Sequence, residues 1–151
     1  MIQRIQSLFL LAAALMGILL LFIPSFTIIF NNLRIPLVLE PIRAAGLNST
    51  AGHTAAVFIN FAGLVIALGT VFLYQRRELQ IKLCYLLALV WVVLGGMIAL
   101  CPFVNANGAA FELNMNAFVF SFVGLAIVAA LMAARFIKKD IDLLKSADRI
   151  R

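Results

Sequence analysis

Charged side chains are scarce in this sequence, and their scarcity identifies the solvent around it. Only 12% of the 151 residues are charged, whereas 65% are hydrophobic. A soluble domain carries about twice that charged fraction, and a chain this short cannot hide so much apolar surface from water. The sequence therefore predicts an integral membrane protein that forms a single domain.

Reactive residues are equally few. Cys84 and Cys101 are the two cysteines; a helix would hold them about 25 Å apart, whereas a disulfide needs Cα atoms within about 7 Å. His53 is the single histidine and has no partner at metal-ligand spacing. Glu40 and Glu112 are distant in the sequence, and no phosphate loop or nucleophile motif is present. We therefore expect no enzyme activity, no metal and no cofactor.

Four long apolar runs dominate the chain. Each approaches the ~20 residues that a helix needs to cross a hydrocarbon core of ~30 Å. The first is too long for the apolar part of a signal peptide, so we expect it to be retained. We predict an all-α bundle of four transmembrane helices at residues 5–23, 54–74, 83–100 and 117–137. The remaining segments are two outer loops at 24–53 and 101–116, a cytoplasmic loop at 75–82 and a cytoplasmic tail at 138–151.

The basic residues are distributed unevenly about these four helices. Ten of the twelve Lys and Arg lie on the side of the termini and the 75–82 loop, and only Arg34 and Arg43 lie on the other. Because basic loops stay in the cytoplasm, this distribution predicts a bacterial inner-membrane protein with both termini cytoplasmic. It is a topology signal rather than a nucleic-acid patch, so we expect no nucleic-acid partner.

The outer loops contain short patterns typical of strands. Two apolar β-branched runs flank Asn31–Asn32, which favours a hairpin with a tight turn. In the second loop, Asn107–Gly108 indicates a turn before AAFELN, which could form another strand. We predict a small extracytoplasmic sheet. The alternative is that Ile28–Phe30 prolong the first helix.

The centres of the predicted spans lack the charges that ion-coupled transporters need. Asn60 is the most polar deep residue, and a hydrogen bond to a neighbouring helix is its favoured role over lining a ligand cavity. Small residues recur at close spacing in every span and allow helices to approach one another, either within the bundle or with a partner. These residues are Ala13 and Gly17; Gly63 and Ala67; Gly95, Gly96 and Ala99; and Ala126, Ala130 and Ala134.

We predict that the cytoplasmic tail forms an amphipathic C-terminal helix with an apolar stripe, because Ile137, Ile141, Leu144 and Ala147 recur at helical spacing. Such a helix needs a surface to lie on, either lipid or protein. Three carboxylates, Asp140, Asp142 and Asp148, favour a protein surface, which includes Arg76 and Arg77 of the same chain. The residues expected to contact a partner or membrane lipids are Arg76, Arg77, Lys82, Lys138, Lys139, Ile141, Leu144, Arg149 and Arg151.

Three stretches, MIQRIQSLFLLAA, RRELQIKLC and IKKDIDLLKSADRIR, are together similar to a known family. The chain resembles four-span inner-membrane proteins of about this length from Bacteroidota, catalogued as a domain of unknown function. The resemblance covers essentially the whole chain and implies the four-span topology, but it implies no catalytic residues.

Two functional hypotheses follow from these patterns. The first is a non-enzymatic accessory or structural subunit that assembles with a larger membrane complex, with a membrane-protein partner or as a homo-oligomer. The second is a small transporter or channel for a hydrophobic or lipid-like molecule.

Overall fold

Four long helices form the body of the protein. The structure is a computed structural model, and it describes residues 3–30, 33–38, 51–73, 76–105, 114–115 and 117–148. The helices are α1 (Gln3–Phe22), α2 (Ala51–Phe72), α3 (Arg77–Asn105) and α4 (Ala117–Asp148). All four are long and apolar enough to cross a membrane, as the sequence predicts. The chain is therefore a multi-pass membrane protein.

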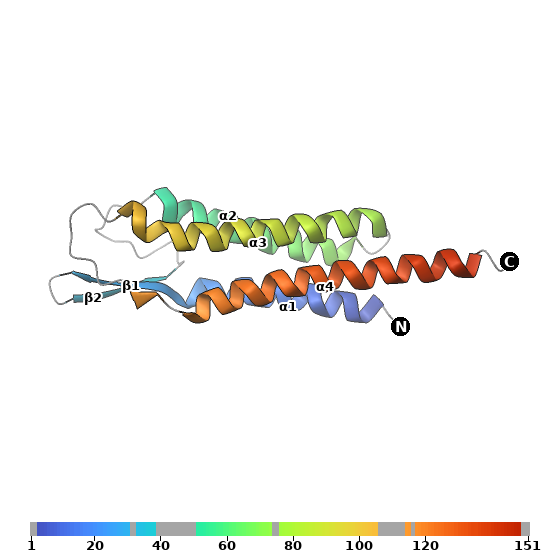
Figure 1. Cartoon of the computed structure of the whole chain (residues 1–151), viewed down its shortest axis with the longest axis horizontal. Helices are drawn as coiled ribbons and strands as arrows, with labels where there is room; N and C mark the ends of the chain where they lie inside the picture. The colour runs from blue at the N-terminus through green and yellow to red at the C-terminus, as the bar shows by residue number, and fades with distance from the viewer. Residues whose placement is uncertain are drawn as a thin grey trace.

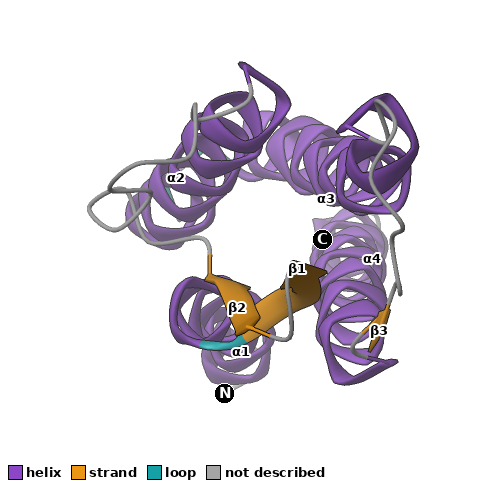
Figure 2. Ribbon diagram, turned by 90° about the vertical axis from the view of Figure 1, so that its left-hand side faces the viewer, coloured by secondary structure: helices purple, strands orange, loops and turns teal. Residues whose placement is uncertain are grey.

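The helices are arranged in a ring. Helix α1 contacts α2 and α4, and α3 contacts the same two helices; Figure 2 shows this order in a view along the bundle. Successive helices run in opposite directions, so the start of α1, the α2–α3 connection and the end of α4 lie together (Figure 1). We call this end, formed by residues 76–82 and 135–148, the basic end.

A three-stranded antiparallel sheet lies at the opposite end of the bundle (Figure 1). Its strands are β1 (Pro24–Phe30), β2 (Leu33–Val38) and β3 (Asn114–Met115), in the order β2-β1-β3. Pro24 lacks the backbone N–H that another helical turn would need, so α1 ends at Phe22. Ile28 pairs with Ile35 in β2 and so does not prolong the helix. The predicted turns at Asn31–Asn32 and Asn107–Gly108 lie outside the described residues. The extracytoplasmic side stays a prediction.

Two helices extend beyond the membrane spans that hydropathy predicts. Helix α3 begins at Arg77, so most of the expected 75–82 loop is helical. Helix α4 continues without a break to Asp148, so the tail from residue 138 is an extension of the fourth span. The physical reason is that hydropathy reports where lipid ends, whereas a helix continues into water wherever its residues favour it.

The connection between α2 and α3 is short and well hydrogen-bonded. The backbone N–H of Arg76 donates to the carbonyl of Leu73 at 3.1 Å. The side-chain Nε2 of Gln80 donates to the carbonyl of Thr70 at 3.1 Å, which satisfies one of the carbonyls at the end of α2. The start of α3 is thereby fixed against the end of α2.

The indole of Trp91 fills the interior where three helices meet. Trp91 belongs to α3 and is fully buried. A Cβ added at Gly17 of α1 would lie 2.5 Å from Trp91 Cη2 and 2.9 Å from Leu64 Cδ2. At Gly63 of α2 an added Cβ would lie 3.6 Å from Trp91 Cζ2. Because lipid tails are as apolar as the helices, such close contacts, rather than apolar burial, hold the bundle together.

The small residues mainly serve packing inside this chain. The rows on α1, α2 and α4 are buried, namely Ala13, Gly17, Gly63, Ala67, Ala126, Ala130 and Ala134. On α3, an added Cβ at Gly95 would meet Val123 Cγ1 of α4 at 3.1 Å, whereas Gly96 is exposed with nothing within 4 Å. Three of the four rows therefore bring the protein's own helices together.

We predict that Gly17→Ala destabilises the protein, because the new methyl group overlaps the Trp91 ring. Overpacking of this kind costs about 1–3 kcal/mol. Thermal unfolding in detergent micelles, followed by the fluorescence of the single tryptophan, should show a lower Tm. Gly69→Ala is the matched control, because an added Cβ there meets nothing within 4 Å. An equal Tm for both variants would contradict the proposed role of Gly17.

Candidate functional site at the basic end

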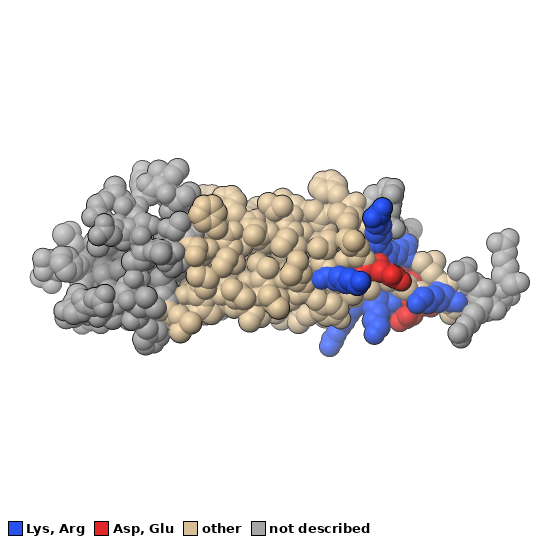
Figure 3. All heavy atoms as spheres, turned by 90° about the horizontal axis from the view of Figure 1, so that it is seen from above, with Lys and Arg blue, Asp and Glu red and all other residues tan. Residues whose placement is uncertain are grey.

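Charge is concentrated at the basic end. Every Lys, Arg, Asp and Glu side chain that the structure describes falls within residues 76–82 or 135–145. Figure 3 shows these blue and red side chains gathered beyond an uncharged body. An uncharged body suits the hydrocarbon of a membrane, whereas charged groups need water or lipid headgroups. The basic end is thus the part of the described molecule equipped for polar recognition.

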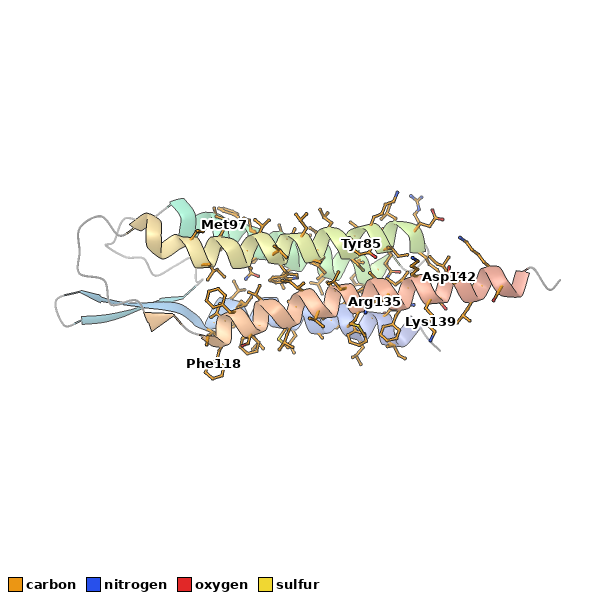
Figure 4. The ribbon with its side chains drawn as sticks, viewed as in Figure 1. Tyr85, Met97, Phe118, Arg135, Lys139 and Asp142 are labelled. Atoms are coloured by element: carbon orange, nitrogen blue, oxygen red, sulfur yellow. The ribbon has the colours of Figure 1, made fainter. Side chains whose placement is uncertain are left out.

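Helix α4 extends far enough to project from the membrane. Its 32 residues span about 48 Å, whereas the hydrocarbon core is about 30 Å thick. A segment of ~20 residues from Ala117 ends at about Phe136, close to the first charged residue of α4, Arg135. Figure 4 shows Arg135, Lys139 and Asp142 in succession along α4 toward the end that leaves the bundle.

Apolar contacts fix the first turns of this projecting segment. Ile137 is fully buried, and Ile141 is partly buried against the core. The ring of Phe136 stacks on Phe9 of α1 with centroids 5.4 Å apart. Leu144, in contrast, is 48% exposed. The apolar stripe expected from the sequence therefore packs on the protein over its first half, and its last member, Ala147, has a side chain outside the described part.

An ion pair joins the projecting segment to the start of α3. Arg77 Nη1 lies 2.7 Å from Asp140 Oδ2, and the two side chains are only 28% and 15% exposed. Water screens a partly buried pair less than a fully exposed one. One of the three tail carboxylates thus contacts the 76–82 segment of the same chain and links the projecting part of α4 to the start of α3.

An open groove of about 610 Å³ lies between these two segments. Its walls come from the start of α3 and from the projecting part of α4. The lining residues are Arg76, Arg77, Glu78, Leu79, Lys82, Ile141, Leu144 and Lys145. Four of these side chains are basic and one is acidic, so the groove has a positive potential suited to an anion.

The groove brings together five of the residues that the sequence singles out: Arg76, Arg77, Lys82, Ile141 and Leu144. Lys138 and Lys139 are exposed on α4 but do not line it, and Arg149 and Arg151 lie outside the described residues. Sequence reasoning missed Lys145 and the α3 residues Glu78 and Leu79. Lys145 could have been found, because it follows Ile141 by four residues and so shares its helix face.

Asn60 lies away from this end, inside the bundle. It is fully buried, and its Nδ2 donates a hydrogen bond of 3.2 Å to the carbonyl oxygen of Gly17. The bond links α2 to α1 beside the Trp91 contact. Such a bond contributes about 0.6 kcal/mol on average in a membrane protein.

The remaining candidate residues form no site in the described structure. Cys84 is buried, and Cys101 belongs to the same helix, α3, so the length of the helix separates them. His53 lies in the first turn of α2. The side chains of His53 and Cys101, and all of Glu40 and Glu112, lie outside the described residues.

Comparison with known proteins places the chain in a family. A family model described as a domain of unknown function (DUF4293) matches residues 2–150. The chain belongs to the DUF4293 family. No curated protein matches it, and no solved structure matches it. For this DUF4293 member the expected source, Bacteroidota, stays a prediction.

We predict a measurable coupling between Arg77 and Asp140. A double-mutant cycle with Arg77→Gln and Asp140→Asn should give about 0.5–1 kcal/mol in thermal unfolding. The coupling should shrink as salt is added, because ions screen the pair. The control cycle combines Arg77→Gln with Asp142→Asn, since Asp142 is exposed, and these two effects should simply add. Additive effects in both cycles would contradict an energetic role for the pair.

Proposed function

We propose that this protein is a non-enzymatic accessory subunit of a larger complex in a bacterial inner membrane. The proposal draws on three features of the described structure: a closely packed interior, glycines left open on the outer surface, and a charged end that projects beyond the lipid. The partner in this proposal is another membrane protein or a second copy of the chain.

The close packing of the interior supports a structural role. The Trp91 ring leaves no room for a side chain at Gly17, and the Asn60 amide is used in a bond between two helices. A small transporter for a lipid-like molecule is less well supported, because Asn60 is the residue expected to line its path. Transport would require these contacts to break and re-form.

The surface that favours a partner lies on α3 and α4. Gly96 and Gly124 are exposed, and an added Cβ at either meets nothing within 4 Å. Gly96 follows Gly95 and Gly124 follows Val123, and Gly95 lies against Val123 where α3 and α4 meet. A missing side chain lets a foreign helix approach closely, and lipid cannot match the resulting dispersion contacts. These open glycines are the observation that carries the proposal.

The same proposal places the basic end in the cytoplasm, because basic segments resist translocation. Green fluorescent protein fused after Arg151 should therefore fluoresce, and alkaline phosphatase at the same position should be inactive. Phosphatase inserted between Ala45 and Gly46 is the control and should be active. An active C-terminal phosphatase fusion would reverse the proposed orientation.

The partner contact can be tested with one glycine. We expect Gly96→Leu to reduce the amount of co-purified partner about tenfold, equivalent to about 1.4 kcal/mol, because the added side chain blocks close approach. Purification from native membranes in mild detergent, followed by native mass spectrometry, would measure the partner and its stoichiometry.

Val65→Leu is the matched control, since Val65 is 68% exposed and lies on α2, outside the proposed partner surface on α3 and α4. Both variants should keep the Tm of the parent protein. A protein that always purifies alone as a monomer would refute the accessory role. Equal retention by both variants would remove Gly96 from the interface.

A further inference from the structure

The groove at the basic end lies at the depth of lipid headgroups. Ile137 is fully buried at the level where the charges begin, and Ile141 and Lys145 follow it by about 6 and 12 Å along the helix. The headgroup layer occupies roughly 5–8 Å on each side of the hydrocarbon core. Ile141 thus lies within the headgroup layer, and Lys145 lies about 4 Å beyond it, where its long side chain can reach back toward the phosphates.

The charges of the groove favour an anion. Within the part of the chain that the structure describes, Arg77 is the lining residue that forms an ion pair, with Asp140, so its charge is neutralised. Arg76, Lys82 and Lys145 are exposed and belong to segments on both sides of the groove. Glu78 is the one carboxylate on the lining, so the three exposed cations exceed it. Helix α3 also begins here, and its N-terminal dipole adds positive potential.

The apolar part of the lining distinguishes a lipid from a small anion. Leu79 is 39% exposed and Leu144 is 48% exposed, and both line the groove. Leucines beside cations match a molecule with a phosphate next to glycerol and acyl chains. A volume of about 610 Å³ is within the range of small-molecule sites.

We propose that this groove binds the headgroup of an anionic glycerophospholipid. Arg76, Lys82 and Lys145 contact the phosphate-bearing headgroup, and Leu79 contacts the adjoining glycerol and acyl region. The Arg77–Asp140 pair positions the site by holding the projecting part of α4 at its distance from α3. This proposal goes beyond the accessory role and does not require a protein partner.

Native mass spectrometry of the purified full chain tests the proposal. The probes are phosphatidylglycerol and phosphatidylcholine with identical acyl chains, added to the protein in neutral detergent. We expect phosphatidylglycerol to bind with the higher affinity. Replacing Arg76, Lys82 and Lys145 together with Gln should weaken its binding about tenfold or more and leave phosphatidylcholine unchanged.

The control removes the same amount of charge outside the groove. Arg135, Lys138 and Lys139 are exposed and do not line it, so their joint replacement with Gln should change binding less than threefold, on the scale of diffuse attraction. Equal losses in the two triple variants would overturn the proposal in favour of general surface charge. If the groove variant does not purify, Lys145→Glu alone should still lower phosphatidylglycerol binding.

Two further outcomes identify other occupants. Displacement of the lipid by inorganic phosphate at comparable concentration would overturn the lipid assignment and indicate a phosphate site. Undiminished phosphatidylglycerol binding by the groove variant, together with loss of a co-purified acidic protein, would assign the groove to that protein. Leu79→Asp should weaken phosphatidylglycerol binding and leave the amount of any co-purified acidic protein unchanged.

Discussion

The fold depends on the fit of one indole against two glycines. In lipid, apolar surfaces gain little by meeting one another, so a membrane bundle needs contacts that lipid chains cannot imitate. Trp91 supplies such a contact, because its rigid ring is fully buried and reaches the backbones of α1 at Gly17 and α2 at Gly63. Asn60, almost one turn from Gly63, bonds to the carbonyl of Gly17. The shape of the Trp91 ring and the hydrogen bond of Asn60 therefore fix α1, α2 and α3 against one another at the same level of the bundle.

The packing of the helices in the bundle also determines the geometry of the basic end. Helix α4 lies against α1 and α3 through buried alanines such as Ala126, Ala130 and Ala134, whose small size permits close approach. Because α4 is one uninterrupted helix of 32 residues, its register inside the bundle also sets the positions of Asp140 and Lys145 outside. The two walls of the groove are thus positioned by the continuous helix α4 and by the short connection between α2 and α3.

The sequence predicts the number and approximate positions of the helices better than it predicts where they end or which residues they bring into contact. The need for ~20 apolar residues per crossing is visible in composition, so the four spans were accessible. The helical spacing of the apolar stripe also made a helical tail accessible, but its unbroken continuity with the fourth span and the helical start at Arg77 were not, because hydropathy carries no information about a helix in water. The Gly17–Trp91 contact joins distant parts of the chain and depends on the ring order of helices. Among three tail carboxylates, Asp140 shares a face with Ile137 and Leu144, so its inward position was available from helical phase.

The presence of Asp140 in a basic region has a physical explanation. A partly buried guanidinium without a counter-charge costs free energy, and removal of one member of such a pair exposes that cost. Asp140 therefore allows Arg77 to lie at the helix junction, where both side chains are largely covered. Arg76, Lys82 and Lys145 are exposed and carry no such constraint, so their charge can act on molecules outside the chain. The basic end thus divides its charges between a pair that builds the groove and cations that give it a positive potential.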